Sequence, residues 1–220
     1  MKFGAILFDL DGTLLNTLED LTDSVNAAMA YGGYPLHTMD EVKSYVNNGA
    51  RRLIERACPA GTQGAAIDAC LGYFEAHYKQ NMNNKTRPYP GVLAMLQQLK
   101  AMRVKCAVVS NKFDGAVKPL CARYFGDLVD AAIGEHEQDG IRRKPWPDTV
   151  FEALRVLQVD ASQALYVGDS NVDVETARNA GLACLAVTWG FRSRESLVEA
   201  GATHFADRVD QLIDEAARIG

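Results

Sequence analysis

The sequence lacks the features of membrane and nucleic-acid-binding proteins. No stretch approaches the roughly 18 consecutive apolar residues that a membrane-spanning helix needs, so we expect no membrane partner. Lysine and arginine together number 23, against 28 aspartate and glutamate residues, which gives a net charge of −5. An acidic chain is poorly suited to bind a polyanion, so no nucleic acid partner is expected either.

Cysteine is scarce and follows no pattern. There are five cysteines, an odd number, and none forms a C-x-x-C pair, which argues against a disulfide framework and against a thiolate zinc site. The apolar run at residues 3–8 is too short for a secretion signal. The four histidines are scattered without metal-ligand spacing. We therefore expect reduced cysteines and a cytoplasmic protein.

Five short apolar runs predict a parallel β-sheet. Each is bounded by Gly, Asp, Asn or Ser and is apolar almost throughout, which is typical of strands buried on both faces. Stretches with helical spacing lie between most of them, so the pattern predicts an α/β fold with a Rossmann-like parallel sheet. A last segment, Val209–Ile219, resembles a closing amphipathic helix. The predicted strands are Gly4–Phe8, Val104–Ser110, Leu128–Gly134, Ala164–Gly168 and Ala183–Thr188.

One interval interrupts this alternation. Between the first two predicted strands, residues 16–86 show helical patterning and no convincing strand. The proline-rich segment Arg87–Gly91 is typical of a stiff linker that leads back into the sheet. We therefore predict a core domain of residues 1–15 and 87–220 and an inserted helical cap domain of residues 16–86. The cap is expected over the carboxyl ends of the strands, where open α/β sheets bind ligands.

Two carboxylates directly follow the first predicted strand. Asp9 and Asp11 start on one side of the extended chain, and Gly12 and Thr13 suit a tight turn after them. A turn or a helix cap would explain one aspartate but explains two poorly. A calcium loop of the EF-hand type would need its glycine two positions later, and a helix before it. A metal-assisted catalytic pair fits the segment best.

A second acidic pair follows the fourth predicted strand. Asp169 stands at the end of that strand, and Asp173 is four residues further on, one helical turn away. Asp169 could simply cap the next helix. If the two strands are neighbours, however, Asp9, Asp11, Asp169 and Asp173 crowd together, and such a cluster needs a cation. Oxygen ligands without His or Cys favour Mg²⁺.

Groups of the opposite polarity follow two other strands. Ser110 and Asn111 end the second predicted strand and can direct donors at a phosphate, although an ordinary polar turn would look the same. Lys144 belongs to a basic run after the third strand. That run could be a solvated segment before a helix, or it could place one cation beside the acids.

Together these segments resemble the haloacid dehalogenase-like phosphohydrolases. The resemblance covers the whole chain and lies in Asp9–Thr13, Ser110-Asn111, Lys144-Pro145 and the Gly168-Asp169-x₃-Asp173 segment. The helical insertion resembles the cap of the cap-one branch. Within that branch, residues 46–50, 111–112 and 188–191 resemble those of phosphoglycolate phosphatases.

The resemblance implies a mechanism and a role for each motif residue. Asp9 is expected to attack phosphorus and form an aspartyl-phosphate, and Asp11 to act as general acid and then general base. The implied Mg²⁺ ligands are Asp9, Asp11 through its backbone carbonyl, Asp169 and, directly or through water, Asp173, which could instead orient Lys144. The implied phosphate-binding residues are Ser110, Asn111, Lys144, Gly12 and Thr13.

The expected substrate is a small phosphorylated metabolite, most specifically 2-phosphoglycolate. Arg51, or its neighbour Arg52, could grip a substrate carboxylate, unless both merely line a solvated helix face. A sugar-phosphate phosphatase or phosphomutase and a pyrophosphatase remain alternatives, and a non-enzymatic phosphoacceptor or binding module is a further one. The chain is expected to be a monomer or a homodimer.

Overall fold

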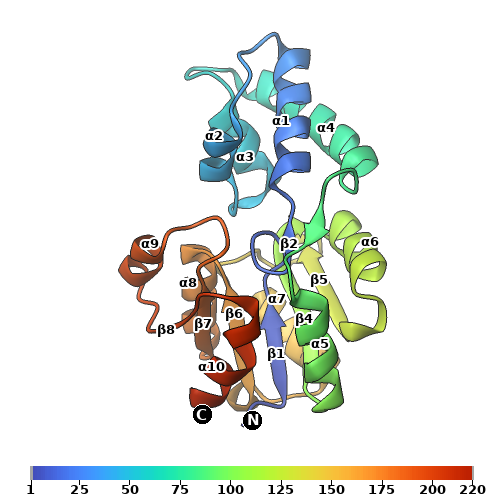
Figure 1. The fold of residues 1–220 in the computed structure, drawn as a ribbon. Coiled ribbons are helices and arrows are strands. Elements are labelled where there is room, and N and C mark those ends of the chain that lie inside the picture. The colour runs from blue at the N-terminus through green and yellow to red at the C-terminus, as the bar shows by residue number, and fades with distance from the viewer. Residues whose placement is uncertain (1, 220) are drawn as a thin grey trace. The chain divides into compact units, whose positions relative to one another are not determined.

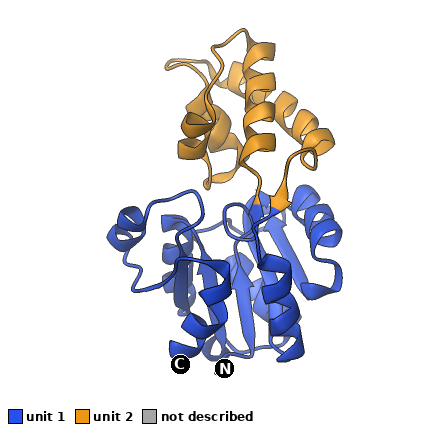
Figure 2. Ribbon diagram, viewed as in Figure 1, with its two compact units in different colours: residues 1–15, 88–220 blue, residues 16–87 orange. Residues whose placement is uncertain are grey.

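The computed structural model describes residues 2–219. Within the chain, two compact units are separated: Met1–Leu15 together with Pro88–Gly220, and Asn16–Arg87 (Figure 2). The chain passes between them through two short strands, β2 (Leu15–Asn16) and β3 (Arg87–Pro88), which pair with each other. Of the described helices, none has both the length and the apolarity to cross a membrane.

The larger unit is built on a six-stranded sheet in the order β5-β4-β1-β6-β7-β8. Every neighbouring pair in it is parallel, with β1 in register between β4 and β6. This confirms the predicted α/β class. The strands are β1 Ala5–Phe8, β4 Lys105–Phe113, β5 Ala131–Glu135, β6 Ala164–Gly168, β7 Ala183–Val187 and β8 His204–Ala206.

Helices cover both faces of this sheet, as Figure 1 shows for α5 and α10 on one side and α7 on the other. Alternate strand residues such as Leu7 and Val109 form a buried core with Val150 and Leu154 of α7 and Ala177 of α8. Burial on both faces explains why the strands are apolar throughout. The helices are α5 Val92–Ala101, α6 Asp114–Tyr124, α7 Asp148–Leu157, α8 Asn171–Ala180, α9 Arg194–Glu199 and α10 Leu212–Arg218.

All five predicted strands are present, and two of them differ from the predicted bounds by more than one residue. β4 continues to Phe113, three residues beyond its apolar run, and β5 begins only at Ala131 because Gly126–Leu128 form a 3₁₀ turn. The sequence analysis missed β8, α6 and α9. β8 has three residues and α9 six, too few for a periodic signal. α6 contains Pro119, which usually marks a helix end.

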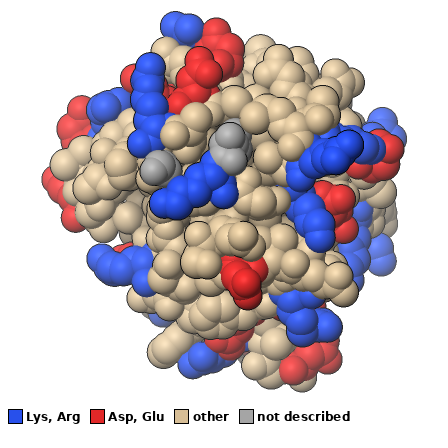
Figure 3. Space-filling view, turned by 90° about the horizontal axis from the view of Figure 1, so that it is seen from below, with Lys and Arg blue, Asp and Glu red and all other residues tan. Residues whose placement is uncertain are grey.

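The closing segment forms a 3₁₀ turn, Val209–Gln211, before α10 begins at Leu212. β1 begins and α10 ends at the lower end of the view in Figure 1, and Figure 3 looks at the molecule from below. On that face, lysine and arginine side chains lie among aspartate and glutamate, with no broad area of one sign. This mixture agrees with the modest net charge of −5.

The smaller unit consists of helices whose apolar stripes meet in its interior. Val25 and Met29 of α1, Ile54 of α3 and Phe74 and Tyr78 of α4 are buried. α2 begins with a capping box, in which Thr38 and Glu41 bond each other's backbone N–H. The helices are α1 Leu18–Gly32, α2 Met39–Tyr45, α3 Gly49–Ala57 and α4 Gly64–Asn81.

Candidate active site

Asp9 lies at the carboxyl end of β1, in the middle of the sheet. Its backbone N–H donates to the carbonyl of Val167 on β6 at 2.9 Å, one residue beyond the last register pair of the two strands. The sheet therefore fixes its backbone position. Its side chain is almost completely buried, although carboxylates are rarely buried unless they are paired.

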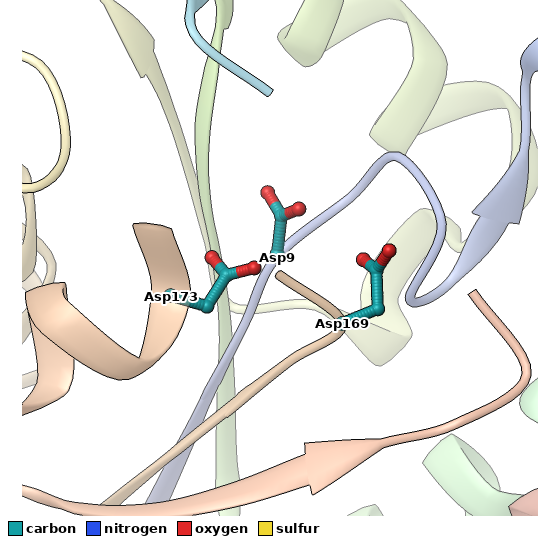
Figure 4. Close-up of side chains that lie close together, drawn as sticks. All are labelled: Asp9, Asp169 and Asp173. Atoms are coloured by element: carbon teal, nitrogen blue, oxygen red, sulfur yellow. The ribbon is translucent and has the colours of Figure 1, made fainter. Parts of the chain in front are cut away.

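Three buried carboxylates meet at this point. Asp9, Asp169 and Asp173 can each offer one carboxylate oxygen such that these oxygens lie within 4.8 Å of one another. Figure 4 shows the three side chains where β1 and β6 end and α8 begins. The adjacency of β1 and β6 brings Asp9 and Asp169 together, as the crowding argument predicts, and the first turn of α8 carries Asp173 back to them.

Asp169 is held from two sides. The hydroxyl of Thr13 donates to its Oδ1 at 2.9 Å, and the backbone N–H of Phe191 donates to its Oδ2 at 2.7 Å. Thr13 is itself fixed, because the indole N–H of Trp189 donates to its carbonyl at 3.0 Å. Two glycines make room for the carboxylate: a Cβ at Gly12 or Gly190 would lie 2.3–2.4 Å from Asp169 atoms.

Lys144 supplies the positive charge beside the acids. Its ammonium donates to Oδ1 of Asp9 at 2.8 Å and to Oδ1 of Asp173 at 2.7 Å, and the side chain is almost fully buried. The Asn111 side chain holds the Lys144 backbone: its amide donates to the Lys144 carbonyl at 3.0 Å and accepts from the Lys144 N–H at 2.7 Å. The structure thus gives Asn111 a positioning contact that the sequence analysis did not foresee.

Asp173 is occupied on both carboxylate oxygens. Oδ1 accepts from Lys144, while Oδ2 accepts from the Ser170 hydroxyl at 2.6 Å and from the Ser170 N–H at 3.0 Å. Ser170 and Asp173 form the capping box that begins α8. The cap at this helix is therefore Ser170, and Asp169 is left to face the other acids.

The electrostatics of the cluster show a shortage of positive charge. Burial raises the pKa of Asp9 well above its usual range; the Lys144 ammonium opposes this rise, and the charges of Asp173 and Asp169 add to it. Burial and the Asp173 charge also raise the pKa of Asp169 to about 7. For Lys144, burial lowers the pKa, but the Asp173 and Asp9 carboxylates outweigh it and raise the pKa. Lys144 is therefore a fixed cation facing three acids.

This donor set fits a hard divalent cation. Three carboxylates against one ammonium leave uncompensated negative charge in a buried place, which a bound cation would relieve. The ligand atoms offered are oxygens, as Mg²⁺ prefers. The Asp11 carboxylate does not belong to the group of three, and metal binding by the Asp11 backbone carbonyl stays a prediction.

Asp11 instead pairs with a second lysine. The ammonium of Lys112, at the end of β4, lies 3.0 Å from Oδ2 of Asp11, and both side chains are largely buried. The hydroxyl of Ser110 accepts from the Lys112 N–H at 3.2 Å and so keeps its own proton for donation. Ser110 and Lys112 lie near the carboxyl end of β4, the strand that pairs with β1.

The other predicted phosphate-binding residues also have partners within the chain. The Gly12 N–H donates to the Leu15 carbonyl at 2.9 Å, and its φ of 89° suits glycine. The Thr13 hydroxyl donates to Asp169. Gly12 and Thr13 therefore help to fix the loop that follows Asp9 and Asp11. Their contact with a phosphate stays a prediction.

Arg51 lies on α3 of the smaller unit. Its guanidinium pairs with Asp68 at 2.7 Å and with Glu55 at 3.1 Å, and the side chain is half exposed. Arg52 also pairs with Glu55, at 2.8 Å. Both arginines thus take part in an exposed ion-pair network within their own unit, and a role in substrate binding stays a prediction.

Sequence reasoning gave no individual role to two residues of the site, Tyr166 and Lys112. Tyr166 of β6 has its hydroxyl 3.1 Å from the Lys144 ammonium, but in the sequence it is one apolar strand residue among others. Lys112 entered the sequence analysis only within residues 111–112, which carry part of the family resemblance. A signal was available for Tyr166: it stands three residues before Asp169 in a strand predicted to be buried, and a buried phenol usually finds a polar partner.

Comparison with known proteins agrees with this geometry. Residues 6–187 match the family model described as haloacid dehalogenase-like hydrolase, so the chain belongs to this family. A phosphoglycolate phosphatase of Pseudomonas savastanoi pv. phaseolicola is 33% identical over 94% of this chain and 78% of its own length. One of Rhodospirillum rubrum is 37% identical, over 96% and 89% of the two chains.

The fold is also shared with solved structures. A candidate phosphoglycolate phosphatase of Lactobacillus delbrueckii subsp. bulgaricus superposes with a TM-score of 0.92 and 35% sequence identity, over 99% of this chain and 98% of that one. Family, relatives and structural similarity together identify a phosphatase, that is, a hydrolase of phosphoric monoesters.

Proposed function

We propose that this phosphatase is Mg²⁺-dependent, forms an aspartyl-phosphate on Asp9 and acts on a small phosphate monoester, specifically 2-phosphoglycolate. The observation that carries the proposal is the meeting of Asp9, Asp169 and Asp173 with Lys144 at the carboxyl end of a parallel sheet. The relatives named phosphoglycolate phosphatase support the choice of substrate.

The nucleophile is one oxygen of Asp9. Lys144 donates to Oδ1 of that carboxylate, which leaves Oδ2 to attack phosphorus. The bond between phosphorus and the ester oxygen then breaks, and Asp11 gives its proton to the departing oxygen. In the second half, Asp11 takes a proton from the water that attacks phosphorus, which releases inorganic phosphate and restores Asp9.

Ser110 is proposed to bind the phosphoryl group through its hydroxyl, and Lys144 to stabilise that group through its positive charge. The Ser110 hydroxyl keeps a proton to donate, and the Lys144 ammonium lies beside Asp9, where charge builds up on the equatorial oxygens. Asn111 supports this role indirectly, because its side chain holds the Lys144 backbone in place. Gly12 and Thr13 contribute by shaping the adjoining loop.

A divalent cation would be held by Asp9 and Asp169, with the Asp11 carbonyl as a further ligand. Bound there, it would supply positive charge that offsets the repulsion between the phosphoryl group and the Asp9 carboxylate. We assign Asp173 to orienting Lys144, because Asp173 already accepts from Lys144 on one oxygen and from Ser170 on the other. A contact between Asp173 and the cation through water is compatible with this assignment.

The inserted unit of residues 16–87 is proposed to act as a cap. A cap excludes bulk water from the phosphoryl transfer and selects the leaving group. Arg51 is the proposed partner of a substrate carboxylate, which 2-phosphoglycolate has and simpler esters lack.

The five cysteines are free thiols in the structure, which suits the reducing conditions of the cytoplasm.

The test is a comparison of kcat/KM across 2-phosphoglycolate, sugar phosphates, nucleotides and pyrophosphate, with and without EDTA and added Mg²⁺. We expect 2-phosphoglycolate to have the highest value, EDTA to remove activity and Mg²⁺ to restore it. Asp9→Asn should abolish turnover and the covalent phosphoryl adduct while the protein stays folded. Retention of more than a few per cent of the activity would refute Asp9 as nucleophile; a preference for another phosphate would refute the substrate alone.

A further inference from the structure

Tyr166 connects the hydrophobic core of the larger unit to the acidic cluster. The residue is fully buried, and its ring belongs to the core formed by the sheet with α7 and α8. Its hydroxyl lies 3.1 Å from the Lys144 ammonium, 3.2 Å from Oδ1 of Asp173 and 3.5 Å from the Val109 carbonyl. A phenol in a core needs one polar partner, and this one has three within reach.

The direction of these hydrogen bonds follows from chemistry. An ammonium can only donate, so the phenol oxygen accepts from Lys144. The phenol proton then goes to Asp173, because the carboxylate is closer than the Val109 carbonyl and carries charge. Burial also raises the pKa of Tyr166 well above its usual value, so the hydroxyl keeps that proton.

The same contacts complete the coordination of Lys144. An ammonium has three N–H groups, and Lys144 has three acceptors: Oδ1 of Asp9 at 2.8 Å, Oδ1 of Asp173 at 2.7 Å and the Tyr166 hydroxyl at 3.1 Å. Of the three, only Tyr166 is neutral, and its ring is locked in the core. The Tyr166 oxygen is therefore a fixed acceptor that holds the Lys144 ammonium within hydrogen-bond distance of Asp9.

We propose that Tyr166 is a positioning residue for catalysis: its hydroxyl holds the Lys144 ammonium on the Asp9 carboxylate. The inference rests on the proposed function, since it assigns Tyr166 an effect on turnover through Lys144. Without the hydroxyl, one N–H of Lys144 loses its acceptor, and the ammonium moves toward Asp173 or toward the substrate side. Asp9 then loses part of its neutralising charge at the stage when its oxygen attacks.

The experiment compares Tyr166→Phe with Tyr78→Phe, which removes a phenol from another fully buried tyrosine, in the smaller unit. Steady-state hydrolysis of p-nitrophenyl phosphate with saturating Mg²⁺ is measured for both, together with Tm. For Tyr166→Phe we expect kcat to fall roughly tenfold, as for the loss of one hydrogen bond to a charged group, with KM changed less than about twofold. For Tyr78→Phe we expect kcat to stay within about twofold of the parent.

A double-mutant cycle separates positioning from packing. In a Lys144→Ala background, Tyr166→Phe should cost nothing further, because a residue that acts through Lys144 has no effect without it. An equal loss in both backgrounds, or an unchanged kcat for Tyr166→Phe in the parent, would overturn the proposal. A crystal structure of Tyr166→Phe is a second readout: a Lys144 ammonium still 2.8 Å from Asp9 would also overturn it.

The controls keep this test apart from that of the proposed function. If Asp9→Asn or Lys144→Ala retains parental activity, the proposed function fails regardless of Tyr166. If Asp9→Asn is inactive, Lys144→Ala is strongly impaired and Tyr166→Phe behaves like the parent, only the role of Tyr166 fails.

Discussion

The ammonium nitrogen of Lys144 lies 2.8 Å from Oδ1 of Asp9, although 135 positions separate the two residues in the chain. Asp9 comes from β1, and the loop that carries Lys144 follows β5, two strands away in the sheet. Asn111 of the intervening β4 spans this distance by holding the Lys144 backbone. Three neighbouring strands thus cooperate to place one cation on one carboxylate.

Removal of Lys144 should therefore affect catalysis strongly. We expect Lys144→Ala to lower kcat on the order of 10²–10³-fold, as for the loss of one group that stabilises transition-state charge. Lys118→Ala is the matched control, since that lysine is exposed and pairs with Asp114 on α6. It should keep parental kcat. Equal activity of the two variants in steady-state assays would contradict the assignment of Lys144.

The Mg²⁺ requirement should depend on pH. Because burial and the Asp173 charge raise the pKa of Asp169 to about 7, a proton competes with the metal below that pH. We expect the Mg²⁺ concentration for half-maximal activity to rise as pH falls from about 8 to about 6. Titrations of activity with Mg²⁺ at fixed substrate saturation measure it. A requirement that stays constant across this range would be inconsistent with the raised pKa.

The metal-free protein should become less stable as pH rises. The folded state holds a proton on Asp169 up to about pH 7, whereas in the unfolded chain the carboxyl ionises near its ordinary pKa of 3.8. Between these values the folded state binds more protons, so the free energy of unfolding falls as pH increases. In EDTA, Tm should decrease from pH 5 to pH 8, and Asp169→Asn should flatten that decrease. A parental slope in Asp169→Asn would assign the effect to other groups.

The Thr13 hydroxyl should influence metal binding through Asp169. It donates to Oδ1 of Asp169 at 2.9 Å, and loss of a hydrogen bond that orients a metal ligand typically costs 10–100-fold in metal affinity. Thr13→Val should raise the Mg²⁺ concentration for half-maximal activity roughly tenfold and leave kcat at saturating Mg²⁺ nearly unchanged. Thr176→Val is the control, because its buried hydroxyl donates to the helix carbonyl of Val172. Similar Mg²⁺ curves for the two variants would argue against the role of Thr13.

Sequence patterns were sufficient for five of the six strands and for the meeting of Asp9 with Asp169, because both follow from local rules. Continuous apolarity marks strands buried on two faces, and aspartates that end neighbouring strands, such as Asp9 and Asp169, must come together. Tyr166 and Asn111 were harder, because their contacts depend on which loop packs against which strand. A tyrosine in an apolar run gives no sign of the Lys144 ammonium 22 positions away.

Element ends were the least predictable part of the fold. β4 extends through the polar residues Ser110, Asn111 and Lys112, which are buried through tertiary packing at the carboxyl end of the strand. Leu93 fits the helical stripe of α5 but is exposed, while Val92 and Leu96 are buried. In both cases tertiary contacts, rather than residue type, decide which side chains are covered.

The last prediction concerns substrate selection by the inserted unit. Arg51 pairs with Asp68 and Glu55, and an exposed network of this kind contributes little to stability, so its loss should leave Tm nearly unchanged. If Arg51 or Arg52 grips the carboxylate of 2-phosphoglycolate, Arg51→Ala with Arg52→Ala should raise KM for that substrate about tenfold or more. Hydrolysis of p-nitrophenyl phosphate, which has no carboxylate, should stay at the parental level. Arg87→Ala, which removes an exposed arginine paired with Glu19, is the control. An unchanged ratio of kcat/KM for the two substrates would exclude both arginines as the carboxylate partner and leave the phosphatase chemistry of Asp9 untouched.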